Sequence, residues 1–170
     1  MNKDLLQKQK DIESFLSGET LEKNKIEAGK IRFNALGKML KTLEEYKDFI
    51  KYIKANEDIF GIVNFYTPVL TVEYENLSYE YGIELNGSLC EGAGYNGRIN
   101  LSRLYEAAAK SSDYSNVNIK EIDALCFNFD EFKKNLDKIL ENVFDETLKN
   151  MTEMKKSEDD ALKKLSAFSS

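Results

Sequence analysis

The sequence predicts an α+β fold: two N-terminal helices, a central antiparallel β-meander of about four strands, and C-terminal helices packed on one face of the sheet. Apolar residues recur at helical spacing before residue 56 and again after residue 100. Between these segments, apolar and polar residues alternate, which is typical of half-buried strands. The 170 residues are about one domain in length. We therefore expect a single domain, helical over 1–56, antiparallel sheet over 57–100, and helical over 101–170.

The N-terminal segment contains two helical patterns. The first covers residues 1–16, with Asn2 as its cap and Ser17-Gly18 as its end. The second runs from about Thr20 or Asn24 to Ala55, and its apolar residues follow one another at alternating spacings of three and four: Leu36, Met39, Leu43, Tyr46, Ile50 and Ile53. This seam predicts packing against another helix of the same chain, with a coiled-coil dimer as the alternative. We expect a monomer or a weak homodimer.

The central segment predicts the meander. Strands are expected within residues 59–66, 69–75 and 78–85, with Asn86-Gly87 as a hairpin turn. A turn at Asn76-Leu77 would place Glu73 opposite Glu80. It would also pair Val72 with Tyr81, Tyr74 with Tyr79 and Leu70 with Ile83. One face would then carry Val72, Tyr74, Tyr79, Tyr81, Ile83 and Leu85, and the other Glu73, Glu75, Glu80 and Glu84.

The C-terminal segment predicts three helices. The first covers residues 101–110 and is capped by Asn100. The other two begin at Asn118 and Asn128, because each asparagine is followed three residues later by a glutamate. A wide apolar stripe from Phe129 to Met151 must be buried in the last helix. Residues 152–170 form a weakly amphipathic, candidate mobile tail.

The composition excludes several classes of site. The chain has no histidine, which excludes Ser-His-Asp and Cys-His nucleophile systems and histidine-ligated zinc. Cys90 and Cys126 are far apart and have apolar neighbours, so we expect reduced, structural cysteines. No apolar run is long enough for a signal-peptide core or a membrane span, so we expect a cytoplasmic protein without membrane contact. We expect no cofactor and no metal.

The stretch from Cys90 to Arg98 contains Gly92, Gly94 and Gly97 in the G-x-G-x-x-G spacing of dinucleotide-binding loops. That fingerprint needs a parallel strand before it and a helix starting on it. Here the preceding strand belongs to an antiparallel hairpin, so the pattern favours a hairpin tip with a turn at Asn96-Gly97. The alternative is an anion nest made by the amides of these glycines with Arg98.

Charge is distributed unevenly along the chain. Residues 57–97 carry seven acidic side chains and no lysine or arginine, although lysine and arginine are frequent on both sides. This predicts an acidic partner-binding surface formed by Glu73, Glu75, Glu80, Glu84, Glu91 and Tyr95. Its partner would be a basic protein, for example one with a nucleic-acid-binding groove. The glutamate carboxylates of this chain would occupy the positions of phosphates in that groove. The alternatives are a solvated sheet face and a magnesium or calcium site.

Three classes of function remain. The first is a non-enzymatic inhibitor, immunity or anti-defence protein that occupies a basic surface and does not itself bind nucleic acid. The second is a small acidic dimeric chaperone or adaptor that holds a client protein. The third is a carboxylate- or metal-dependent enzyme with a glutamate pair as acid and base.

Overall fold

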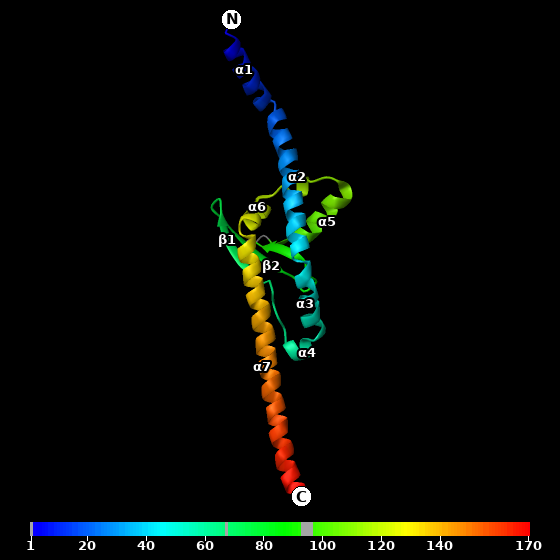
Figure 1. Ribbon diagram of the computed structural model, residues 1–170. Helices are drawn as coiled ribbons and strands as arrows, with labels where there is room; N and C mark the ends of the chain where they lie inside the picture. The colour runs from blue at the N-terminus through cyan, green and yellow to red at the C-terminus, as the bar shows by residue number, and fades with distance from the viewer. Residues whose placement is uncertain (1, 67, 93–96) are drawn as a thin grey trace.

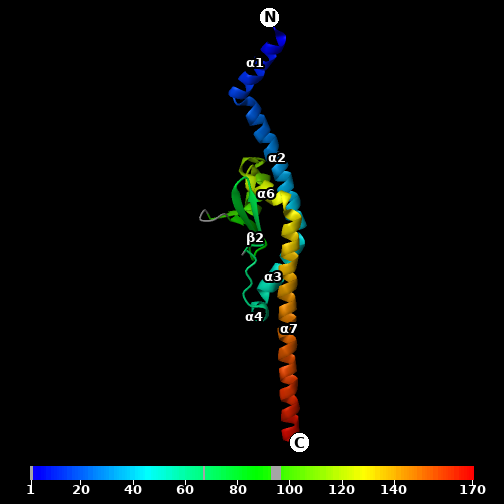
Figure 2. The ribbon, with the colours of Figure 1, turned by 90° about the vertical axis from the view of Figure 1, so that its left-hand side faces the viewer.

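The computed structural model describes residues 2–66, 68–92 and 97–170 and confirms the α+β class. The molecule is elongated, and its two termini lie at opposite ends (Figure 1). The middle of the molecule has two layers: a four-stranded sheet on one side, and the long helices on the other (Figure 2). One helical arm leaves this body at each end.

The N-terminal segment forms four helices: α1 (Lys3–Leu16), α2 (Glu19–Thr42), α3 (Glu44–Ala55) and the short α4 (Glu57–Phe60). Asn2 caps α1 as predicted, because its side-chain oxygen accepts hydrogen bonds from two amides of the first turn. The expected single helix up to Ala55 is interrupted at Leu43, where α3 starts in a new direction. All six seam residues from Leu36 to Ile53 are buried within the one chain, which confirms intrachain packing.

The sheet consists of β1 (Leu70–Tyr74), β2 (Leu77–Ile83), β3 (Leu89–Gly92) and β4 (Arg98–Asn100) in sequential, fully antiparallel order. The Asn86-Gly87 hairpin is confirmed: Gly87 has a φ of 83° and donates its amide to the carbonyl of Glu84. The predicted faces are also confirmed, because Val72, Tyr79, Tyr81 and Ile83 are buried while Glu73 and Glu80 are exposed.

Two details of the predicted sheet are wrong. The segment 59–66 is not a strand, since it contains the end of α4 and then extended chain. The predicted register is displaced by two residues: Tyr74 pairs with Leu77 and Thr71 with Glu80, so Glu75 and Asn76 form the turn. Both turn residues have positive φ, 48° and 64°. Asparagine tolerates this conformation best among non-glycine residues, which favours a turn containing Asn76 near its centre. A two-residue displacement keeps each side chain on its face.

The C-terminal segment forms α5 (Leu101–Ser111), a 3₁₀ turn (Ser115–Val117), α6 (Lys120–Phe127) and α7 (Phe129–Ser169). Asn100 caps α5 as predicted. Helices begin near both predicted asparagines, because α6 starts at Lys120 and α7 at Phe129, directly after its N-cap residue Asn128. Neither asparagine side chain makes a capping hydrogen bond, however. The Asn118 side chain instead bridges Arg32 and the carbonyl of Lys25, and the Asn128 side chain donates to the carbonyl of Ala124. The Asn118 side chain is thus engaged by residues far along the chain, and the Asn128 side chain by the last turn of α6, in place of the local cap.

The core lies between the sheet and the long helices. Tyr81 donates its hydroxyl to the carbonyl of Glu121 at 2.5 Å, and Asn135 of α7 donates to the carbonyl of Val69 at 2.9 Å. Burial and the hydrogen bond to Asp137 raise the pKa of Tyr46, whose hydroxyl connects α3 to α7. These contacts hold α6 and α7 on the Val72–Tyr81 face of the sheet.

The apolar stripe of α7 is only partly buried. Phe132, Leu136 and Leu140 are covered by the body, but Leu148 is 60% exposed and Met151 48% exposed. The expectation that the whole stripe up to Met151 is buried is therefore wrong. From residue 148 to its end the helix continues away from the body, and every one of its residues is exposed (Figure 1).

Candidate protein-binding surfaces

The acidic sheet face contains two exposed carboxylates that make no ion pair with a described residue. Glu73 on β1 lies opposite Ser78, and Glu80 on β2 lies opposite Thr71, so the two glutamates occupy diagonal positions on one face. Both side chains are exposed, and the residues directly opposite them are uncharged. These two residues form the part of the predicted surface that is open to a partner.

Two further glutamates of the predicted surface are engaged in ion pairs. Glu75, in the β1–β2 turn, pairs with Lys120 at the start of α6. Glu84, just after β2, lies 3.5 Å from Arg98 of β4. Lys120 and Arg98 lie outside residues 57–97, the segment without lysine or arginine. The fold therefore places two positively charged side chains next to the acidic sheet face. The surface is accordingly less acidic than the local sequence indicates.

Glu91 is not on the exposed acidic face, which corrects its expected placement. It lies in β3 opposite Tyr81 and Ile99, shares the core-facing side with Tyr81, and is only 1% exposed. Its Oε1 has no hydrogen-bond partner among the described residues. Desolvation by burial, followed by the charges of Glu121 and Glu80, raises the pKa of Glu91 to about 7. A buried carboxyl of this kind cannot contribute directly to a surface patch.

Gly82 on β2 and Gly92 on β3 have a packing role. The Tyr66 hydroxyl lies 1.9 Å from where a Cβ of Gly92 would stand, and the Tyr66 backbone lies 2.6 Å from the corresponding position on Gly82. Arg98 covers the ring, with its guanidinium carbon 3.6 Å from the Tyr66 centroid. Both glycines therefore leave room for Tyr66 on the outer face of the sheet.

This arrangement bears on the two expectations for the glycine loop. The strand before it and the strand after it are antiparallel, so the dinucleotide-binding frame is absent from the described hairpin. Arg98 already contacts Tyr66 and Glu84. Gly97 has a φ of 76°, which suits the predicted hairpin. Gly94, Tyr95 and Asn96 lie outside the described residues, and the anion nest stays a prediction.

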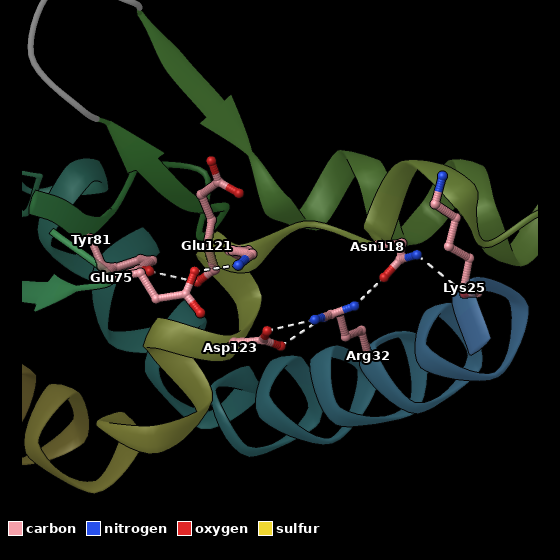
Figure 3. A network of polar contacts seen from close by, with 8 residues as sticks. Lys25, Arg32, Glu75, Tyr81, Asn118, Glu121 and Asp123 are labelled. Atoms are coloured by element: carbon pink, nitrogen blue, oxygen red, sulfur yellow. Dashed lines mark hydrogen bonds and ion pairs between the residues drawn. The ribbon is translucent and has the colours of Figure 1, made fainter. Parts of the chain in front are cut away.

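A polar network between α2 and α6 was not predicted from the sequence. Arg32 donates to both carboxylate oxygens of Asp123, at 2.7 and 2.6 Å, and to the Asn118 side chain (Figure 3). Hydrogen bonding to Asp123 raises the pKa of Arg32. Because each group has a protein partner, the network fixes α6 against α2, which is a structural role.

A hollow of about 860 Å³ lies between α2 and the α6–α7 junction. Met39 and Phe129 line it together with the exposed Cys126, Lys38 and Glu131. Neither Glu73 nor Glu80 borders it. Among the described residues, no three cysteine, aspartate or glutamate side chains are grouped to hold a metal ion. Over the same residues, no helix is both long and apolar enough to cross a bilayer.

Exposed apolar side chains are concentrated on the two arms. The N-terminal arm, residues 3–26, exposes Leu5, Ile12, Phe15, Leu16, Leu21 and Ile26. The C-terminal arm, residues 148–169, exposes Leu148, Met151, Met154, Leu162, Leu165 and Phe168. At 3.6 residues per turn, most of these side chains fall on one face of each helix. The apolar spacing on the C-terminal arm was visible in the sequence. There it predicted a buried stripe up to Met151 and a weakly amphipathic tail after it, not an exposed apolar face.

No protein-family model, curated protein or solved structure matches this chain.

Proposed function

We propose that this protein is a binding protein that joins other protein chains through its two amphipathic helical arms. The observation that carries the proposal is the set of exposed apolar stripes on α1 and on α7 beyond residue 147. Contiguous exposed apolar surface on a folded protein marks an interaction site. The proposal corresponds to the chaperone or adaptor class, which the sequence left open as an alternative to the inhibitor class.

The position of the arms supports this function. They leave the body at opposite ends, so each is accessible along most of its length (Figures 1 and 2). The body between them has its own core, with the seam of α2 and α3 and the inner sheet face both buried. A rigid body with an amphipathic helix at each end is suited to hold two partners apart or to assemble copies of one chain. Amphipathic helices bind by placing the apolar face in a groove or against another helix.

Site-specific photo-cross-linking in cells of the native host tests the proposal. A photoreactive residue replaces Ile12 or Leu165, on the apolar faces, and in matched controls replaces Lys10 or Lys163, two residues away on the opposite faces. We expect covalent protein adducts from the apolar positions and few from the controls. Equal adduct yields at all four positions, or none at Ile12 and Leu165, would contradict the proposal.

A second candidate function is the binding of a basic protein by the acidic sheet face. Exposed Glu73 and Glu80 favour it, because neither is in an ion pair with another described residue. The test uses partners captured by the first experiment. Reversal of both glutamates to lysine should slow association and weaken its salt dependence, whereas Glu106→Lys with Glu141→Lys should have a smaller effect. Equal association rates for the two double variants would exclude this face.

A further inference from the structure

The C-terminal arm is a long helical segment without a partner in its own chain. All its residues are exposed, and Phe168 is 92% exposed. Helices in proteins obtain most of their stability from packing of an amphipathic face, and an unpacked helix of this length is marginal in water. The stripe on this arm is therefore expected to be covered in the functional state.

The exposed stripe continues the face of α7 that packs on the body. At 100° per residue, Met151 and Leu165 fall on the same side of the helix as the buried Leu136 and Leu140, and Leu148 lies one turn beyond Phe144 at the edge of that face. At the base of the arm, Phe144 contacts Phe60 of α4, with ring centroids 5.3 Å apart, and Phe49 of α3 at 6.1 Å. A helix bound to the stripe would thus occupy the place along α7 that α3 and α4 occupy within the body (Figure 1).

Two charged residues interrupt the stripe at its centre. Leu148, Met151, Lys155, Glu158, Leu162 and Leu165 follow one another at spacings of three and four, the a and d pattern of a coiled coil. Lys155 and Glu158 make no ion pair with any residue that the structure describes. A partner helix that packs along these six positions therefore meets one positive and one negative charge in the middle of an apolar contact.

We propose that the partner is a second copy of this chain, bound through antiparallel C-terminal arms. With the two-fold axis between residues 156 and 157, Leu148 lies opposite Leu165 of the second copy and Met151 opposite Leu162. Lys155 then lies opposite Glu158 of the second copy, twice by symmetry. An in-register parallel pair would instead place lysine against lysine and glutamate against glutamate. Charge complementarity therefore selects the antiparallel orientation.

The contacts of α7 with the body are compatible with this register. In it, Ser169 of the second copy lies level with Phe144, where α3 and α4 begin to cover α7. Phe168 of the second copy then lies near Phe49 and Tyr52, which are both about half exposed. A shift of one heptad toward the body would make the arm collide with α4.

Cysteine cross-linking of the full-length chain tests the orientation. In a Cys126→Ser background, which keeps only buried Cys90, Met151→Cys combined with Leu162→Cys should form cross-linked dimers with a short bis-maleimide. Each single cysteine variant should not, because like residues are about 16 Å apart along an antiparallel pair. Cross-linking of the single variants as efficient as that of the double variant would overturn the antiparallel register.

Charge reversal with sedimentation tests the pairing of Lys155 with Glu158. We expect a concentration-dependent dimer for the wild type, and a dissociation constant about tenfold higher for Lys155→Glu or Glu158→Lys. Lys156→Glu and Asp160→Lys make the same charge changes on the opposite face and should leave dimerisation unchanged. The double reversal of Lys155 and Glu158 should restore it.

The inference rests on the proposed function, but the two fail in different ways. A chain that sediments as a monomer at every concentration, or four charge variants with equal dissociation constants, would overturn the second-copy proposal. If the photoreactive residue at position 165 still cross-links to a different protein in cells, the proposed binding function is retained, and that protein, not a second copy, binds the C-terminal arm. If no apolar position on either arm gives an adduct in cells, the binding function itself is excluded.

Discussion

Glu91 and Tyr66 each bring a polar atom into the interior, and neither atom has a hydrogen-bond partner among the described residues. Such groups are costly when buried, because they lose their hydration without compensation. The Glu91 side chain points from β3 to the core-facing side of the sheet, beside Tyr81. Tyr66 covers the outer face of the sheet at Gly82 and Gly92. Substitutions at these two places should therefore have effects on stability that depend on pH, for Glu91, or on the residue at position 92, for Tyr66.

The raised pKa of Glu91 predicts a pH-dependent stability. Its carboxyl has a pKa of about 7 in the folded state, against 4.5 ordinarily, so the folded state favours the protonated form. The stability associated with this group is fully present below about pH 4.5 and is lost as the pH rises through 7. When the pH is raised from about 5 to about 8, the free energy of unfolding of the wild type should fall by roughly 2 kcal/mol more than that of the Glu91→Gln variant.

Urea unfolding of both proteins at the two pH values measures this difference. Glu80→Gln serves as a control, because Glu80 is exposed on the opposite face of the sheet and its removal should preserve most of the wild-type pH dependence. Parallel pH profiles for the wild type and Glu91→Gln would show that another group causes the change.

The contact between Tyr66 and Gly92 predicts non-additive mutations. Gly92→Ala should destabilise the protein by about 2 kcal/mol, because the new methyl group would overlap the Tyr66 hydroxyl. Tyr66→Phe removes that hydroxyl and an unpaired buried oxygen, so it should be close to neutral. In the Tyr66→Phe background, Gly92→Ala should cost clearly less. A double-mutant cycle of unfolding free energies measures the coupling, and strict additivity would contradict the described contact.

At the scale of the element, α2 shows a conflict between helix propensity and packing. Glycine in a helix interior ordinarily costs about 1 kcal/mol relative to alanine. At Gly37, however, an added Cβ would lie 2.8 Å from the ring of Tyr105, which stacks on Phe33 at 4.7 Å. Glycine at position 37 thus lowers the helix propensity of α2 but leaves room for the Tyr105 ring of α5.

The prediction for α2 concerns the sign of Gly37→Ala. We expect this substitution to destabilise the protein by about 1–2 kcal/mol, because overpacking against Tyr105 exceeds the gain in propensity. When Tyr105→Ala is already present, the same substitution should become stabilising. Thermal or urea unfolding of the four proteins measures both effects. A stabilising Gly37→Ala in the wild-type background would mean that α5 is not packed on α2 as described.

At the scale of the whole molecule, the C-terminal arm should contribute to stability only through association. Residues 152–170 are all exposed, so a chain that ends at Met151 should unfold, at low protein concentration, with a free energy within about 0.5 kcal/mol of the full chain. At high concentration the full chain should gain stability and the shortened chain should not, because only folded chains dimerise. Urea unfolding at several protein concentrations measures this. A shortened chain that is much less stable at low concentration would contradict the structure.

The sequence by itself determined the features that depend on local periodicity. The α+β class, the buried seam from Leu36 to Ile53, the Asn86-Gly87 turn and the two faces of the sheet follow from spacings of two or 3.6 residues. The exposure of Glu73 and Glu80 followed from the same alternation. A register displaced by two residues left these results intact, because it preserves the parity of every strand position.

Only the tertiary structure decided which charges and stripes are covered, because these depend on residues far apart in the chain. Lys120 and Arg98 neutralise Glu75 and Glu84 from elements outside the acidic segment, and Tyr66 covers the outer face of β3. Alternation within a strand shows which residues share a face, but not whether another segment lies on that face. For the same reason, the stripe of α7 could not show by itself where the body ends and the uncovered arm begins.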